Sequence, residues 1–277
     1  MTSLDFAPIV AEQPRSLLAQ ESETVTTSLT GKPQQNERIV GGSITNIATY
    51  PFMANMNLNF GGVWRAGCGG TLITTTAVVG SASCVGAPDI HLWRTRLGSN
   101  SATSGGVTIN TARMTPHPNY HWQLRDGNIL VLKLVSPAPI SNNIRPARIA
   151  GANYALPDNL HVYVAGWGLY GGSGLSQQLR HADTRVVNHD LCTRRHAELR
   201  ARPGFGHFPP VWPGDLCTGL LDVGGRGSCE FDYGGPVVHQ RDILVGVIGW
   251  NYACGHPYYP TVNTRVPHYS NWIVSVS

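Results

Sequence analysis

The sequence has little charge and almost no lysine. Only 13% of its 277 residues are charged, and of the 20 basic residues all but Lys32 and Lys133 are arginine. The net charge of +4 is small and no dense basic stripe occurs, which argues against a nucleic-acid-binding protein. Guanidinium stays charged at a pH where ammonium does not, so the arginine bias fits an alkaline fluid. A nucleotide-composition bias of the genome explains it equally well.

Three further features are missing. No apolar run is long enough to span a membrane. The opening MTSLDFAPIVAEQPRS has no basic region, and Asp5 and Pro8 interrupt its apolar run, so no signal peptide is visible. A signal peptide was therefore trimmed, or export is unconventional. The chain also lacks a Cys-x-x-Cys motif, which argues against a zinc ribbon, and it has no Asn-x-Ser/Thr acceptor for N-glycosylation.

The cysteines, in contrast, are even in number. Six in a chain with 32 glycines predict three disulfides and an oxidising, extracellular compartment. The alternative is buried free thiols in a cytosolic protein. Spacing alone leaves fifteen possible pairings. The cysteines are Cys68, Cys84, Cys192, Cys217, Cys229 and Cys254.

Residues 1–38 are polar and indicate a flexible leader, whereas short runs rich in Val, Ile and Thr between turn signals follow it. Such runs are typical of an all-β sandwich or barrel. At the C-terminus, Tyr269, Trp272, Ile273 and Val276 have the spacing of one helix face, so we expect a closing amphipathic helix.

Several ordered motifs then point to one family. The chain resembles the chymotrypsin-like (trypsin-fold) serine proteases, and among them insect trypsins, from RIVGG at residue 38 to the C-terminus. The motifs that carry the resemblance are CGGTLI (68–73), SASC (81–84), HPNY (117–120), NILVLKL (128–134), AGWG (165–168), LDVGGRGSC (221–229), YGGP (233–236), VGVIGW (245–250) and TRV (264–266).

The resemblance implies an all-β fold of two packed six-stranded antiparallel β-barrels with a C-terminal α-helix. We expect a leader over 1–38 and a trypsin-like domain over 39–277. Within that domain, the expected parts are an N-terminal barrel over about 39–150, a C-terminal barrel over about 151–266 and a helix over about 267–277. The family's cysteine pattern implies the pairs Cys68–Cys84, Cys192–Cys217 and Cys229–Cys254.

The family cleaves peptides with a serine, histidine and aspartate triad, in which the hydroxyl attacks and the imidazole takes its proton. The motifs place Ser83 at the histidine position, Asn128 at the aspartate position and Tyr233 at the serine position. A serine hydroxyl cannot accept a proton near neutral pH as an imidazole does, and a tyrosine needs a base to ionise. The resemblance thus predicts a degenerate triad.

The surrounding positions also depart from the family. Phe231 stands where a glycine N–H forms half of the oxyanion hole, and we expect it to rearrange the loop. The specificity pocket has Gly227 where a trypsin has aspartate. Asn251 and Thr261 replace glycines of its walls, so their side chains are expected to narrow it.

The activation segment is retained. Arg38 and Ile39 have the form of the family's activation cleavage, and Asp232 remains as the partner for the freed amine of Ile39. The alternative is that Arg38 is relic sequence and Asp232 caps a local turn.

These departures predict a serine protease homologue that is not an enzyme. It would bind another protein, such as a proteinase, an inhibitor or a surface ligand, with a switch at Arg38. Two alternatives stay open, namely an abundant structural, storage or gut-lumen protein, and an enzyme of unconventional mechanism. We expect no cofactor and no metal, because the calcium-loop region at about 97–110 has no carboxylate and His117 and His121 flank a proline.

Overall fold

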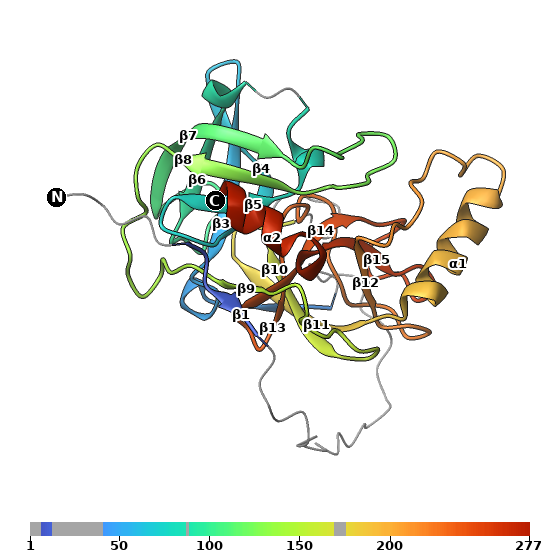
Figure 1. The fold of residues 1–277 in the computed structure, drawn as a ribbon. Helices are drawn as coiled ribbons and strands as arrows, with labels where there is room; N and C mark the ends of the chain where they lie inside the picture. The colour runs from blue at the N-terminus through green and yellow to red at the C-terminus, as the bar shows by residue number, and fades with distance from the viewer. Residues whose placement is uncertain (1–6, 13–40, 87–88, 169–175) are drawn as a thin grey trace.

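The computed structural model describes residues 7–12, 41–86, 89–168 and 176–277. Two closed six-stranded antiparallel barrels lie side by side and form the body of the molecule, as Figure 1 shows. This confirms the predicted fold. None of the helices in these ranges is long and apolar enough to cross a membrane.

The first barrel closes in the strand order β3-β4-β5-β8-β7-β6. Its interior is filled by alternating aliphatic side chains, and Leu130 and Leu132 of β8 are fully buried. The strands are β3 (Met53–Phe60), β4 (Val63–Leu72), β5 (Ala77–Gly80), β6 (Trp93–Leu97), β7 (Val107–Pro116) and β8 (Leu130–Leu134). Single turns of 3₁₀ helix occupy Ile47–Thr49, Ala82–Cys84 and Ile90–Leu92.

The second barrel closes in the order β10-β11-β12-β15-β14-β13, since β13 pairs with both β14 and β10. Two short strands extend its sheet, because β2 pairs with β11 and β9 pairs with β14. The strands are β2 (Ser43–Ile44), β9 (Arg148–Ala150), β10 (His161–Gly166), β11 (Arg180–Val186), β12 (Asp215–Gly219), β13 (Pro236–His239), β14 (Ile243–Trp250) and β15 (Thr261–Arg265).

Part of the predicted flexible leader belongs to this sheet. Strand β1 (Val10–Ala11) pairs in parallel with β9, and the Ala11 side chain is buried. The expectation of flexibility is therefore wrong for this stretch, because its backbone groups pair at a sheet edge that would otherwise stay open. The rest of the leader lies outside the described residues.

Helix α2 (Val266–Val276) lies in front of the junction of the two barrels in Figure 1. It buries Tyr269 and Ile273, as its periodicity predicts, against β9 and β14. The ring of His117, from the first barrel, packs edge-on against Tyr269 and Trp272, with ring centroids 4.9 Å apart in both pairs. The helix thereby contacts both barrels.

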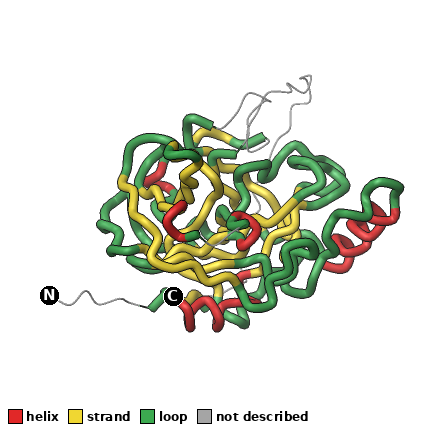
Figure 2. The backbone as a smooth tube through the Cα atoms, turned by 90° about the horizontal axis from the view of Figure 1, so that it is seen from above, coloured by secondary structure: helices red, strands yellow, loops and turns green. Residues whose placement is uncertain are grey.

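A second helix, α1 (His189–Ala201), projects to one side of the second barrel and was not predicted (Figures 1 and 2). Asn188 caps it, because its side chain accepts a hydrogen bond from the Leu191 N–H. Its buried face includes Arg195 and His196 beside Cys192 and Leu199. Since half of that face is polar, the sequence carries no apolar stripe that would reveal a helix.

Candidate functional site

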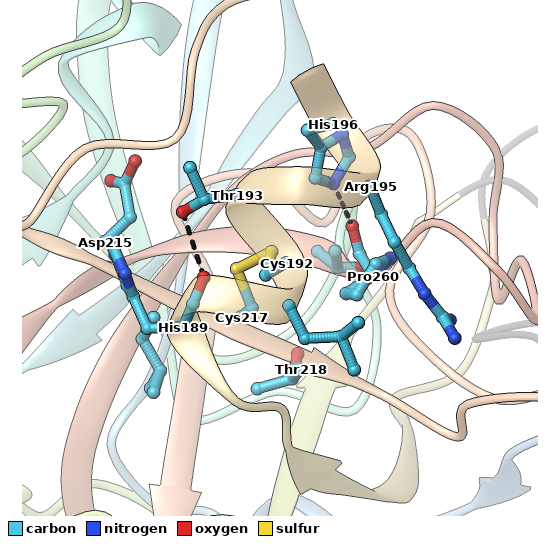
Figure 3. The surroundings of a disulfide bond; sticks show 12 residues. His189, Cys192, Thr193, Arg195, His196, Asp215, Cys217, Thr218 and Pro260 are labelled. Carbon is cyan, nitrogen blue, oxygen red and sulfur yellow. Dashed lines mark hydrogen bonds between the residues drawn. A yellow bond between two sulfur atoms is a disulfide. The ribbon is translucent and has the colours of Figure 1, made fainter. Parts of the chain in front are cut away.

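The three disulfides hold the frame of the site and confirm the predicted pairing. They are Cys68–Cys84, Cys192–Cys217 and Cys229–Cys254. The first fixes the turn that carries Ser83, and the third fixes the loop of the predicted specificity pocket. Figure 3 shows the second, which ties α1 to β12.

Ser83 and Asn128 meet on the first barrel's side of the cleft. The Asn128 Oδ1 atom accepts hydrogen bonds from the Ser83 N–H at 2.8 Å and from the Ser81 hydroxyl at 2.9 Å. The Ser83 hydroxyl lies 2.8 Å from the Ser81 oxygen. Because the Ser81 proton goes to Asn128, the Ser83 hydroxyl donates to Ser81. The three side chains thus form one uncharged chain of hydrogen bonds.

The Asn128 amide nitrogen, in contrast to its oxygen, lacks a hydrogen-bond partner among the described residues. The side chain is only 2% exposed, and its Nδ2 atom has no hydrogen-bond partner among the described residues. A buried donor left unpaired costs roughly 1–3 kcal/mol. Gly249 lies beside it, since a Cβ there would be 3.6 Å from Nδ2. That Cβ would also lie 2.8 Å from the Val262 carbonyl oxygen, so the backbone leaves no room for a side chain that could accept from Asn128.

Tyr233 approaches the same place from the second barrel. Its carbonyl oxygen accepts a hydrogen bond from the Gly69 N–H at 2.9 Å and lies 3.6 Å from the Cys84 sulfur. The structure thus brings Tyr233 beside the turn that carries Ser83. Burial of the phenol raises its pKa above the usual 10, and the nearby carboxylates of Glu230 and Asp232 raise it further.

Phe231 takes the backbone conformation that favours glycine. Its φ is 67° and its side chain is 43% exposed. A residue with a Cβ pays roughly 1–2 kcal/mol in this left-handed region. The phenylalanine thus takes the strained conformation, and its rearrangement of the loop relative to other family members stays a prediction.

Asp232 is completely buried behind this loop. Its carboxylate accepts hydrogen bonds from the Gly168 N–H at 2.8 Å and from the Cys229 N–H at 3.0 Å. Burial raises its pKa to about 6, and the two N–H groups oppose that rise. Its predicted partner Ile39 and the cleavage residue Arg38 lie outside the described residues.

Asn251 and Thr261, at the predicted specificity pocket, both lie near the segment before Cys229. Asn251 donates a long hydrogen bond of 3.4 Å from Nδ2 to the Ser228 carbonyl oxygen, and so links two walls. The Thr261 hydroxyl oxygen lies 3.9 Å from where a Cβ on Gly227 would stand. That these side chains narrow the pocket stays a prediction.

A larger cavity lies next to that pocket and was not predicted. It encloses about 590 Å³ between the loop 122–125 of the first barrel and the segment 206–209 that follows α1. Trp250 and Asn251 form its floor toward the pocket. The exposed Trp122 and the two arginines Arg125 and Arg200 give it both apolar and cationic walls.

Helix α1 contributes a buried histidine that packs against Trp250, one of the residues lining this cavity. The buried His196 pairs through Nε2 with the Pro260 carbonyl oxygen at 2.9 Å, and its ring packs 4.7 Å from that of Trp250 (Figure 3 shows the pair with Pro260). Burial lowers the pKa of His196 to about 4, so the imidazole is neutral above that pH. No sequence pattern indicated this role, because α1 itself was not predicted.

Comparisons with known proteins define the class. The trypsin family model matches residues 39–273. "Trypsin CFT-1" of Choristoneura fumiferana is 38% identical over 248 residues, which cover 89% of this chain and 93% of that protein. "Trypsin, alkaline C" of Manduca sexta is 39% identical over 243 residues, which cover 87% of this chain and 91% of that protein. The chain belongs to the trypsin family.

The comparisons contradict the expectation of a homologue that is not an enzyme. The relatives at 38–39% identity are named trypsins, and trypsins are enzymes. The expectation rested on the triad positions, the oxyanion position and the pocket positions alone. The match with these relatives instead covers both barrels, and with them the whole frame on which the cleft is built.

Proposed function

We propose that the protein acts on polypeptides in a digestive fluid, as a secreted member of the trypsin family, and that Ser83, Asn128 and Tyr233 set the rate at which it cleaves them. The observation that carries this proposal is the match with named trypsins along nearly the whole folded chain. The three disulfides, suited to an oxidising compartment, support secretion.

The polypeptide would lie in the cleft between the barrels. Trp250 and the 590 Å³ cavity that it lines supply apolar surface for the polypeptide. Asn251 obstructs the adjoining pocket, so we infer that binding depends on this cavity more than on one deeply inserted side chain. The partner of this site is therefore a protein or peptide.

Proton transfer limits the reaction in this proposal. Neither Ser83 nor Asn128 takes up a proton near neutral pH, and losing a complete triad costs roughly 10⁶ in turnover in a related enzyme class. The Tyr233 phenol ionises only at high pH, because burial raises its pKa. Hydrolysis that depends on Tyr233 is thus expected to increase with pH, in line with the word "alkaline" in the names of the Manduca sexta relatives.

Cleavage after Arg38 would prepare the site. We infer that the freed amine of Ile39 pairs with Asp232, whose buried carboxylate has two N–H donors but no cation among the described residues. An ammonium group beside Asp232 would lower its pKa and order the loop that carries Tyr233. Asp232→Asn should then lower the stability of the cleaved protein more than that of the uncleaved protein.

The test measures hydrolysis of peptide amides and esters by the full chain before and after cleavage at Arg38, between pH 7 and 11. Trypsin fixed to beads would make the cut and then be removed, and Tyr233→Phe treated in the same way gives the background. We expect slow turnover that rises with pH and exceeds this background. Equal rates for the two proteins at every pH would contradict the proposal.

A further inference from the structure

A second pocket lies on the outer face of the second barrel. It encloses about 310 Å³ against β10 and β11, and residues 41–43 form one wall. Tyr163 and Asp183 face each other across the two strands. The side chains that define it are His161, Tyr163, His181, Asp183, Arg226 and Arg241.

The polar groups at the base of the pocket hold one another in place. Asp183 pairs with Arg226 at 2.7 Å and with His161 at 3.3 Å, so its charge is already compensated. The Tyr50 hydroxyl lies 2.7 Å from His181 Nδ1. This bond fixes the imidazole of His181 and leaves its Nε2 without a partner among the described residues.

Arg241 differs from these groups because no carboxylate compensates it. Its guanidinium lies 4.6 Å above the Tyr163 ring, and in the described part of the chain it makes no ion pair. Stacking occupies the flat face of a guanidinium and leaves the N–H groups at its edge free to donate. Arg241 stands in the turn between β13 and β14 with φ at 68°, so the backbone fixes where its side chain begins.

We propose that this pocket binds a small organic carboxylate, with Arg241 as its charge partner and the His181 imidazole as a second contact. A guanidinium edge matches the two oxygens of a carboxylate. Asp183 offsets the charge of Arg226, so Arg241 supplies the one uncompensated positive charge of the arginines and carboxylates in the pocket, which matches a single carboxylate better than a doubly charged anion such as sulfate. The volume suits a ligand about the size of an acylated amino acid, with its apolar part against the Tyr163 ring.

The pocket also touches the segment that follows the activation site. Gly41 has φ at 66°, and a Cβ there would lie 2.1 Å from the Gly225 carbonyl oxygen and 2.7 Å from Arg226. A ligand between Arg241 and this wall would contact a segment that packs tightly on the loop leading to Cys229. Binding should therefore raise the melting temperature of the protein, since the ligand binds only the folded chain.

The test compares N-acetylglycine with its amide, N-acetylglycinamide, which differs only in the negative charge. Binding to the full chain at pH 8 would be measured by calorimetry and by the melting temperature. We expect a dissociation constant of about 1 mM for the carboxylate and at least tenfold weaker binding of the amide. Because no turnover is measured, the result does not depend on whether the cleft hydrolyses peptides.

Substitutions in the turn between β13 and β14 test whether Arg241 is the charge partner of the carboxylate. Arg241→Asn keeps a residue that tolerates the left-handed turn and should lose at least tenfold in affinity, whereas Arg241→Lys should recover part of it. Gln240→Asn alters the neighbouring turn residue, whose φ is 51°, and should leave the affinity unchanged. Equal binding of the amide, unchanged affinity in Arg241→Asn, or sulfate binding tighter than the carboxylate would each overturn the proposal.

Discussion

The two barrels share a topology but bury different kinds of polar group. Among the described residues, the polar side chains buried in the first barrel are all uncharged, with Asn57 and Asn128 as examples. The second barrel and its helix α1 bury Arg195, His196 and the two carboxylates Asp215 and Asp232. The cleft therefore lies between a barrel that buries only uncharged polar side chains and a barrel that also buries arginine, histidine and aspartate side chains.

This difference separates two kinds of change at the cleft. On the first barrel's side, Ser83 and Asn128 form neutral hydrogen bonds, and the Asn128 amide NH2 group stays without a partner among the described residues. On the other side, Phe231 carries a strained backbone and Asp232 a displaced pKa. We infer that the first side limits the rate through its lack of a base, together with Tyr233 opposite it, and that pH-dependent stability arises on the second side.

The largest expected effect comes from substituting Ser83 and Asn128, on the first barrel's side of the cleft, together with Tyr233 on the other side. Ser83→His, Asn128→Asp and Tyr233→Ser in one variant would supply a base, a carboxylate that orients it and a nucleophile. We expect the rate of peptide-ester hydrolysis at pH 8 to rise roughly 10³-fold or more, although Phe231 remains at the oxyanion position.

The single substitutions serve as controls for this variant. Members of a triad act together, so each change alone should raise the rate less than tenfold. The measurement is kcat/KM on a peptide ester, with stoichiometric labelling by a fluorophosphonate as a second readout. A single substitution that restored most of the rate would show that the other two positions do not limit it.

The next largest effect concerns the second barrel, which buries the carboxyl group of Asp215. Burial raises the pKa of Asp215 to about 8, although the Trp212 N–H donates to it. The folded protein thus holds this proton more tightly than the unfolded chain, whose aspartate has a pKa of 3.8. The stabilisation is complete below about pH 4 and is lost as pH rises toward 8. Between pH 4 and 8, the free energy of unfolding of Asp215→Asn should therefore fall by about 2–4 kcal/mol less than that of the unsubstituted protein.

Urea unfolding at pH 4, 6 and 8 measures this difference. The difference between Asp215→Asn and the unsubstituted protein isolates Asp215, because the other buried groups with displaced pKa values, Asp232 and His196, are present in both proteins. Asn57→Ala is the matched variant in the first barrel, where the Asn57 amide donates to Asn55. It should lower stability by the same amount at every pH. A pH-dependent loss in that variant, or an unchanged slope in Asp215→Asn, would contradict the comparison.

Sequence reasoning succeeded where a residue's role follows from its place in a motif. The two barrels, the three cysteine pairs and the face of α2 were all predicted, because strand patterning and motif order carry them. The cavity beside Trp250 was not, since residues 122–125 and 206–209 converge only through the fold. Helix α1 was missed because it buries Arg195 and His196, and the strand at Val10 because two residues show no period. The inference from the triad, oxyanion and pocket positions to the loss of enzyme function is wrong, because the relatives at 38–39% identity are named trypsins.

The smallest expected effect tests the strain on the second barrel's side. Phe231→Gly removes the Cβ from a left-handed residue, which favours folding by roughly 1–2 kcal/mol, but glycine also gains freedom in the unfolded chain. We expect a net stabilisation of up to about 1 kcal/mol by urea unfolding. Phe231→Ala keeps the Cβ and should show no gain, so the difference between the two variants measures the strain itself. A glycine variant no more stable than the alanine variant would mean that the loop holds Phe231 without strain, and the contrast between the two sides of the cleft would then rest on Asp232 alone.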